Sequence, residues 1–129
     1  MRTLVRSKIH KATVTDANVE YVGSITIDEE LVERAGFWPG EKVLVVSNTT
    51  GERLETYVIV GPRGSGQIIM NGGAAHRIKK GEEIIIIAFE FTDKPIKPQF
   101  ILVDKNNNVT PTRYGGTGPP QGGPPPPTP

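Results

Sequence analysis

The segment EIIIIAFEF, residues 83–91, is apolar at nearly every position. A strand with one solvated face alternates apolar and polar residues, so this continuous run predicts a strand that is covered on both faces. A chain of 129 residues can build only one modest core. One cover is therefore expected to be that core and the other a neighbouring subunit, which favours an oligomer.

Further β-rich segments lie on both sides of this strand. The candidate strands are residues 3–15, 21–27, 42–47, 52–60, 67–70 and 100–103, with turn-forming residues at 48–51, 61–66 and 104–108. Many short strands with one or two small helices predict a mainly β fold built as a compact barrel.

One helix is expected over residues 28–35. Asp28 can cap its N-terminus, the two glutamates that follow suit the helix dipole, and Gly36 can end it. A second short helical turn is expected over residues 74–79.

The last twenty residues, TPTRYGGTGPPQGGPPPPTP, are nearly all Pro, Gly and Thr. Such a segment cannot bury enough apolar surface to offset the entropy of ordering, so residues 110–129 are predicted to be a disordered tail and residues 1–109 the folded domain. A polyproline-II ligand for a partner is the alternative for the tail.

Composition excludes several classes of protein. The formal net charge of +1 gives no electrostatic case for binding nucleic acid or a membrane surface. The chain has no cysteine, which excludes disulfides and thiolate metal sites. Neither a signal segment nor an apolar run of membrane-spanning length is present, so a soluble, cytoplasmic protein is expected.

Familiar catalytic motifs are absent. The glycine-rich loop 61–66 lacks the Lys-Ser/Thr pair of a phosphate-binding loop. Carboxylates are not placed at ligand spacing around His10 or His76, so no metal site is predicted. Ser24 lacks the flanking pattern of a hydrolase nucleophile.

The segment EYVGSITID, residues 20–28, holds a Gly-Ser pair inside an expected strand. Glycine in a strand marks a bulge, a bend or a close backbone approach. Other polar residues also interrupt strand-like segments. Lys8 and His10 share a face of one strand, and Arg53 and Tyr57 share a face of another. Each of these features, taken alone, is explained by a solvated charge, a half-buried tyrosine or a turn.

Taken together, these segments resemble the aspartate alpha-decarboxylase family. The matching stretches are Lys8-Ile9-His10, Tyr21-Val22-Gly23-Ser24, Ala35-Gly36, Arg53 to Tyr57, Arg63-Gly64-Ser65 and Asn71 to His76, in the family's order over residues 1 to about 91. The segment after Phe91 diverges, and the proline tail is not typical of the family.

The resemblance implies a double-psi β-barrel that assembles as a homotetramer with active sites between neighbouring subunits. It also implies self-cleavage between Gly23 and Ser24, which converts Ser24 into a pyruvoyl group, so that no external cofactor is needed. Glycine at position 23 is expected to allow a backbone conformation that turns its carbonyl toward the serine hydroxyl. The reaction implied is the decarboxylation of L-aspartate to β-alanine and CO2 for the synthesis of pantothenate, the precursor of coenzyme A.

The same resemblance implies roles for individual residues. Ser24 and Tyr57 are catalytic, and Gly23, Ser24 and Thr56 take part in cleavage. Substrate is held by Lys8, Arg53, Thr56, Asn71, Gly72, Gly73 and Ala74, with His10 and Tyr21 in support. Which cation holds which substrate carboxylate stays open. Thr56 and Tyr57 are adjacent and point to opposite faces of a regular strand, so both can serve only if the strand bends or if two sites flank it.

A second hypothesis is a non-catalytic small β-barrel that binds a partner or nucleic acid. Its Gly-Ser pair would be an uncut bulge. The near-neutral net charge argues against the nucleic-acid version.

Overall fold

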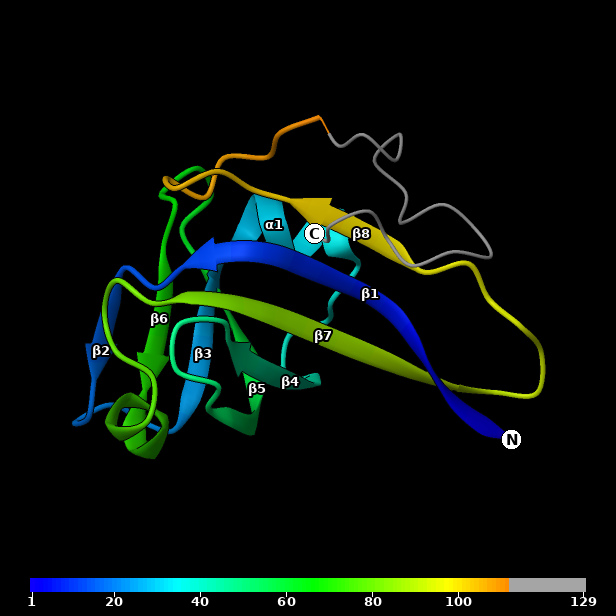
Figure 1. Ribbon diagram of the computed structural model, residues 1–129, viewed down its shortest axis with the longest axis horizontal. Coiled ribbons are helices and arrows are strands. Elements are labelled where there is room, and N and C mark those ends of the chain that lie inside the picture. The colour runs from blue at the N-terminus through cyan, green and yellow to red at the C-terminus, as the bar shows by residue number, and fades with distance from the viewer. Residues whose placement is uncertain (112–129) are drawn as a thin grey trace.

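The computed structural model describes residues 1–111, where eight strands form one mixed sheet in the order β2-β6-β3-β5-β4-β7-β1-β8 (Figure 1). The strands are β1 (Arg2–Thr13), β2 (Asp16–Asn18), β3 (Ser24–Asp28), β4 (Lys42–Ser47), β5 (Arg53–Gly61), β6 (Ile68–Asn71), β7 (Glu83–Thr92) and β8 (Gln99–Leu102). One α-helix, α1 (Glu29–Ala35), and one 3-10 helix, η1 (Gly72–His76), complete it. This confirms the predicted class, a mainly β small barrel with short helices. All but the first two residues of the predicted tail, 110–129, lie outside the described residues.

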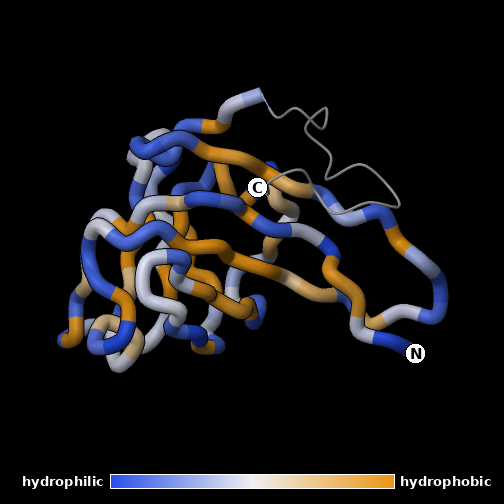
Figure 2. The backbone as a smooth tube through the Cα atoms, viewed as in Figure 1, coloured by the Kyte–Doolittle hydropathy of each residue, from blue (hydrophilic) through white to orange (hydrophobic). Residues whose placement is uncertain are grey.

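Strand β7 lies near the middle of the sheet order, with β1 on one side and β4 on the other. Ile84, Ile86 and Ala88 are fully buried in the core, whereas Ile85 and Ile87 on the opposite face are only half-buried. The chain itself therefore covers one face completely and the other in part. Figure 2 shows the apolar segments gathered along the strands and the polar ones in the connecting loops.

β1 and β7 extend beyond the rest of the sheet as a two-stranded arm (Figure 1). Their antiparallel register runs from Arg2 opposite Thr92 to Thr13 opposite Glu83. Phe91, near the tip of the arm, is 68% exposed. No helix within residues 1–111 is long and apolar enough to cross a membrane.

Most predicted strands are shifted at an end by one or two residues, and three further differences concern the elements around Ser24 and η1. The expected strand 21–27 begins only at Ser24, because its partner β6 ends at Asn71, where the chain turns away at Gly72 with a φ of +66°. A short strand, β2, forms after the expected strand 3–15 and pairs in parallel with β6. The second helical turn is η1, which begins two residues before the predicted 74–79.

Asp28 fixes the junction between β3, α1 and the loop that follows β5. Its carboxylate accepts hydrogen bonds from the backbone N–H groups of Glu30 (2.9 Å), Gly64 (3.0 Å) and Gly66 (2.8 Å). Burial raises the pKa of Asp28, but these hydrogen bonds outweigh it, and the pKa lies below its ordinary value. The predicted cap is thus confirmed, and it also ties down a distant loop.

We expect Asp28→Ala to lower the free energy of unfolding by about 2–3 kcal/mol at pH 7, since three backbone donors lose a charged acceptor. A carboxyl whose pKa is depressed by folding stabilises the fold above its unfolded pKa. That contribution disappears as the pH falls through the folded pKa, so the difference between the two proteins should shrink in acid.

Urea unfolding followed by circular dichroism measures this, in chains that also carry Ser24→Ala and so lack the hydroxyl that the expected self-cleavage requires. Asp93→Ala removes an exposed carboxylate and is the control, with an expected effect within about 0.5 kcal/mol. Equal losses in the two variants would contradict the role assigned to Asp28.

Candidate active site

Ser24 is the first residue of β3 and lies opposite Asn71, the last residue of β6. It is fully buried, and its hydroxyl donates a hydrogen bond to the Val22 carbonyl oxygen at 3.0 Å. The Asn71 amide nitrogen donates to the same hydroxyl at 2.9 Å and to the Thr26 hydroxyl, also at 2.9 Å. With both of its amide protons engaged, Asn71 holds the serine hydroxyl in place directly after the Gly23 peptide.

Gly72 packs closely against the backbone of Gly23, the residue before Ser24. A Cβ placed on Gly72 would lie 2.6 Å from the Gly23 Cα and 2.8 Å from the Gly23 nitrogen. The φ of +66° also disfavours any L-residue at this position. Gly23 itself has no positive φ, and a Cβ there would meet open space. The expectation that Gly23 needs an unusual backbone conformation is therefore wrong for this geometry, and the demand for glycine falls on Gly72.

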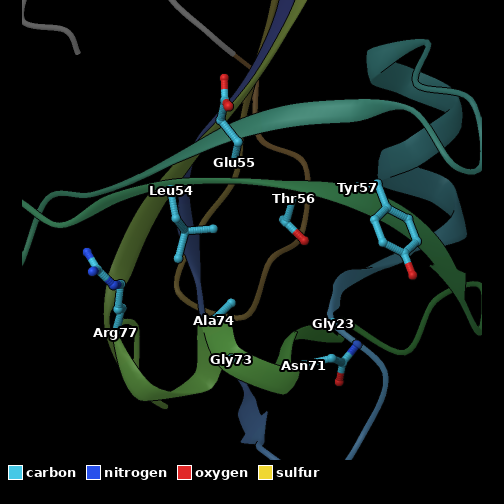
Figure 3. Close-up of a pocket in the computed structure, with 9 residues that line it drawn as sticks. All are labelled: Gly23, Leu54, Glu55, Thr56, Tyr57, Asn71, Gly73, Ala74 and Arg77. Carbon is cyan, nitrogen blue, oxygen red and sulfur yellow. The ribbon is translucent and has the colours of Figure 1, made fainter.

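A cavity of about 410 Å³ opens beside this contact (Figure 3). The residues that line it are Gly23, Leu54, Glu55, Thr56, Tyr57, Asn71, Gly73, Ala74 and Arg77. β5 supplies one wall, while the end of β6 and η1 supply the other. The structure thus brings together, around Gly23, most of the residues that the sequence predicts for cleavage and substrate binding.

Thr56 and Tyr57 both line this cavity, although they are neighbours on one strand. Figure 3 shows the two side chains extending from β5 toward the side where Gly23 and Asn71 lie, whereas Glu55 points away. Tyr57 is 38% exposed, so a ligand in the cavity can contact part of this residue. One cavity therefore holds both residues, and two separate sites are not needed.

Lys8 and Arg53 do not line the cavity. Lys8 belongs to β1, its ammonium lies 4.5 Å from the centre of the Phe100 ring, and burial lowers its pKa. Arg53 is the exposed first residue of β5. Neither side chain forms an ion pair with another residue in 1–111.

The two supporting residues also lie outside the cavity wall. His10 is buried, and within the described chain neither ring nitrogen has a hydrogen-bond partner. Burial, helped by the charges of Lys8 and Lys11 and opposed by that of Glu83, lowers the pKa of His10 to about 4, so the imidazole is neutral at pH 7. Tyr21 is exposed, and its carbonyl oxygen lies 3.0 Å from where a Gly72 Cβ would sit.

Three lining residues were not predicted from the sequence: Leu54, Glu55 and Arg77. Leu54 is two residues before Thr56, so the alternation of β5 was a signal for it. Arg77 follows directly after η1 and had no such signal. No group of three or more His, Asp or Glu residues that could hold a metal ion occurs within residues 1–111.

These features define a class of protein: a small β-barrel with a cavity whose wall holds the glycine of a Gly-Ser peptide together with hydroxyl, phenol and amide side chains. The family model described as aspartate decarboxylase matches residues 1–110. The aspartate 1-decarboxylase of Desulfitobacterium hafniense is 56% identical over 111 residues, which cover 83% of this chain and 87% of that protein.

Similar enzymes from other bacteria show the same extent of match. The aspartate 1-decarboxylase of Pelotomaculum thermopropionicum is 50% identical over 117 residues, covering 88% of this chain and 89% of that protein. The aspartate 1-decarboxylase of Neisseria meningitidis is 47% identical over 112 residues, which cover 84% of this chain and 88% of that protein. The chain belongs to the aspartate decarboxylase family.

The contact between Gly72 and Gly23 generates a testable prediction. Gly72→Ala should lower the free energy of unfolding by about 2–4 kcal/mol, because it adds left-handed strain and a clash with backbone that cannot move aside cheaply. Gly73→Ala is the matched control, since a Cβ at Gly73 meets nothing within 4 Å.

Chemical unfolding in the Ser24→Ala background compares the two variants without the hydroxyl that the expected self-cleavage requires. In the otherwise wild-type chain, Gly72→Ala should also slow the expected cut between Gly23 and Ser24, which a denaturing gel measures. A Gly72→Ala protein as stable as Gly73→Ala would show that the close approach does not constrain the fold.

Proposed function

We propose that this chain cuts itself between Gly23 and Ser24 and then decarboxylates L-aspartate to β-alanine and CO2, in the supply of β-alanine for pantothenate synthesis. The observation that supports this most directly is the buried Ser24 hydroxyl, held by Asn71 beside the Gly23 peptide on the wall of a cavity. The decarboxylation of aspartate is proposed from the name of the similar proteins, aspartate 1-decarboxylase.

In the proposed maturation the Ser24 hydroxyl leaves the Val22 carbonyl and attacks the carbonyl carbon of Gly23. The peptide C–N bond breaks and an ester forms between Gly23 and the serine oxygen. β-Elimination releases the Gly23 carboxylate and leaves dehydroalanine at position 24. Water then adds, ammonia departs, and a pyruvoyl group remains at the new N-terminus. Thr56 lines the same cavity as Gly23, and in this proposal it donates a hydrogen bond to the oxyanion that forms on the Gly23 carbonyl oxygen.

The residues around position 24 fit such a group. The Asn71 amide, which also bonds the Thr26 hydroxyl, already donates a hydrogen bond to the buried Ser24 side chain, and it can donate to a carbonyl oxygen there. When present, the group supplies a ketone that acts as an electron sink, the part that pyridoxal phosphate plays in other decarboxylases. We propose no external cofactor.

The chain's own residues would bind the substrate and move its proton. Tyr57 lines the cavity, and its hydroxyl can deliver the proton that replaces the lost carboxylate. Arg53 and Lys8 carry charges that no acidic residue in 1–111 neutralises, so both remain able to pair with substrate carboxylates. His10, Tyr21 and the Gly72-Gly73-Ala74 backbone are assigned supporting and lining roles.

We also propose that the site is completed by a neighbouring copy in a homotetramer. In the single chain Lys8 does not reach the cavity, and β4 and β7 stand between β1 and β5 in the sheet. The half-buried face of β7 and the exposed Phe91 supply apolar surface for subunit contact. A chain without cysteine suits a reducing compartment, and we place the enzyme in the cytoplasm.

The alternative, a non-catalytic partner-binding barrel, does not account for the phenol, hydroxyl and amide groups that converge on the Gly23 peptide. Family membership over residues 1–110 also disfavours it. The state of the Gly23–Ser24 bond separates the two hypotheses.

Purified protein should contain two chains, residues 1–23 and 24–129. Intact-mass spectrometry should show the second chain lighter than the simple hydrolysis fragment by one ammonia, because the serine has become pyruvoyl. Ser24→Ala lacks the nucleophile and should remain one inactive chain. A wild-type protein that stays uncut after prolonged heating would argue strongly for the non-catalytic barrel.

Tyr57→Phe should cut itself normally but turn over far more slowly. The ring and its packing are kept while the proton donor is lost, and a positioned general acid is worth roughly 10²–10⁴-fold in kcat. β-Alanine release measures turnover, and the cleaved fraction on a gel is the internal control for folding. Wild-type kcat in this variant would remove Tyr57 from the reaction.

A further inference from the structure

One end of the cavity carries a charge that the proposed mechanism does not use. Arg77, the C-terminal cap of η1, is the single cation among the nine lining residues. Figure 3 places its side chain at the far end of the cavity from Gly23, with Leu54 and Ala74 between them. A substrate that approaches Gly23 from that side passes the Arg77 guanidinium first.

The partner of Arg77 is an exposed glutamate. Arg77 Nη1 lies 3.1 Å from Glu52 Oε1, and the two side chains are 63% and 43% exposed. Such a pair contributes little to stability, because water and salt screen both charges. A free carboxylate can therefore replace that of Glu52 at little cost.

The surroundings reinforce the positive charge. The stretch His76-Arg77-Ile78-Lys79-Lys80 holds three cations and no acid, and all of its residues except Ile78 are exposed. Glu55, the one acidic lining residue, points away from the cavity and lies 3.4 Å from Lys42. The chain as a whole carries a net charge of only +1, so this excess is a local property of the segment that holds Arg77.

We infer that Arg77 is a recruitment and selection residue, which draws the anionic substrate into the cavity by exchanging the Glu52 carboxylate for one of the substrate's. This rests on the proposed function. Aspartate carries two carboxylates and one ammonium, and hence a net charge of −1, whereas β-alanine has no net charge. A cationic rim therefore favours the substrate over the product and assists product release.

The inference is tested on the self-cleaved protein with four variants. Arg77→Gln removes the charge, Arg77→Lys keeps it, and Glu52→Gln removes the competing carboxylate. Lys105→Gln is the matched control. It removes one exposed cation from the loop 104–108. Asn107 of this loop donates a hydrogen bond to the Gly66 carbonyl oxygen, near the start of β6, whereas η1 follows the end of β6.

KM and kcat for aspartate, and inhibition by succinate as a dicarboxylate without an amine, are measured over a range of salt. Arg77→Gln should raise KM and the succinate inhibition constant about 2- to 5-fold, the scale of an exposed ion pair, with kcat unchanged. Arg77→Lys should stay near wild type, and Glu52→Gln should shift both constants the opposite way. The salt dependence of kcat/KM should flatten in Arg77→Gln alone.

A purely structural tie between Glu52 and Arg77 predicts something else: both glutamine variants would then move KM in the same direction. That result, or constants for Arg77→Gln equal to those of Lys105→Gln, overturns the inference while leaving the decarboxylase reaction intact. A wild-type chain that neither cuts itself nor releases β-alanine would instead overturn the proposed function.

Discussion

The candidate site depends on one hydrogen bond, from the Asn71 amide to the Ser24 hydroxyl. It exists only because β3 and β6 pair in the register that sets these two residues opposite each other. A slip of one residue would turn the serine to the other face of the sheet. The buried Ile25, Ile27, Ile68 and Met70 hold that register, so the apolar core positions the reactive hydroxyl.

Much of the fold could be predicted from local patterns, whereas the predicted part of the site came from family resemblance. The cap at Asp28 and the strand rich in isoleucine were readable because capping and periodicity act over a few residues. The cluster of Gly23, Thr56, Tyr57 and Asn71 was recognised through family resemblance, since spacing alone left each residue with an ordinary structural explanation.

The rest could not be predicted because it depends on tertiary contacts. The tight approach of Gly72 to Gly23 joins residues far apart in the sequence, so local turn chemistry explains a glycine there without revealing its neighbour. Arg77 reaches the cavity only because η1, which packs beside β2 and β6, faces β5 across it. The predicted ligands Lys8 and Arg53 lie off the cavity wall, which agrees with a site completed by a second copy rather than by one chain.

The position of β1 affects the order of folding and cleavage and the kinetic stability of the protein. β1 pairs with β7 on one side and β8 on the other, and it buries Ile9 and Ala12 completely. The proposed cut after Gly23 would leave β1 and β2 on a separate fragment, held only by hydrogen bonds and packing. Refolding would then require two molecules to meet, while the larger fragment would expose strand edges that invite aggregation. Under this proposal the chain completes its sheet before it cuts itself, and the cut protein lasts as long as its unfolding barrier allows.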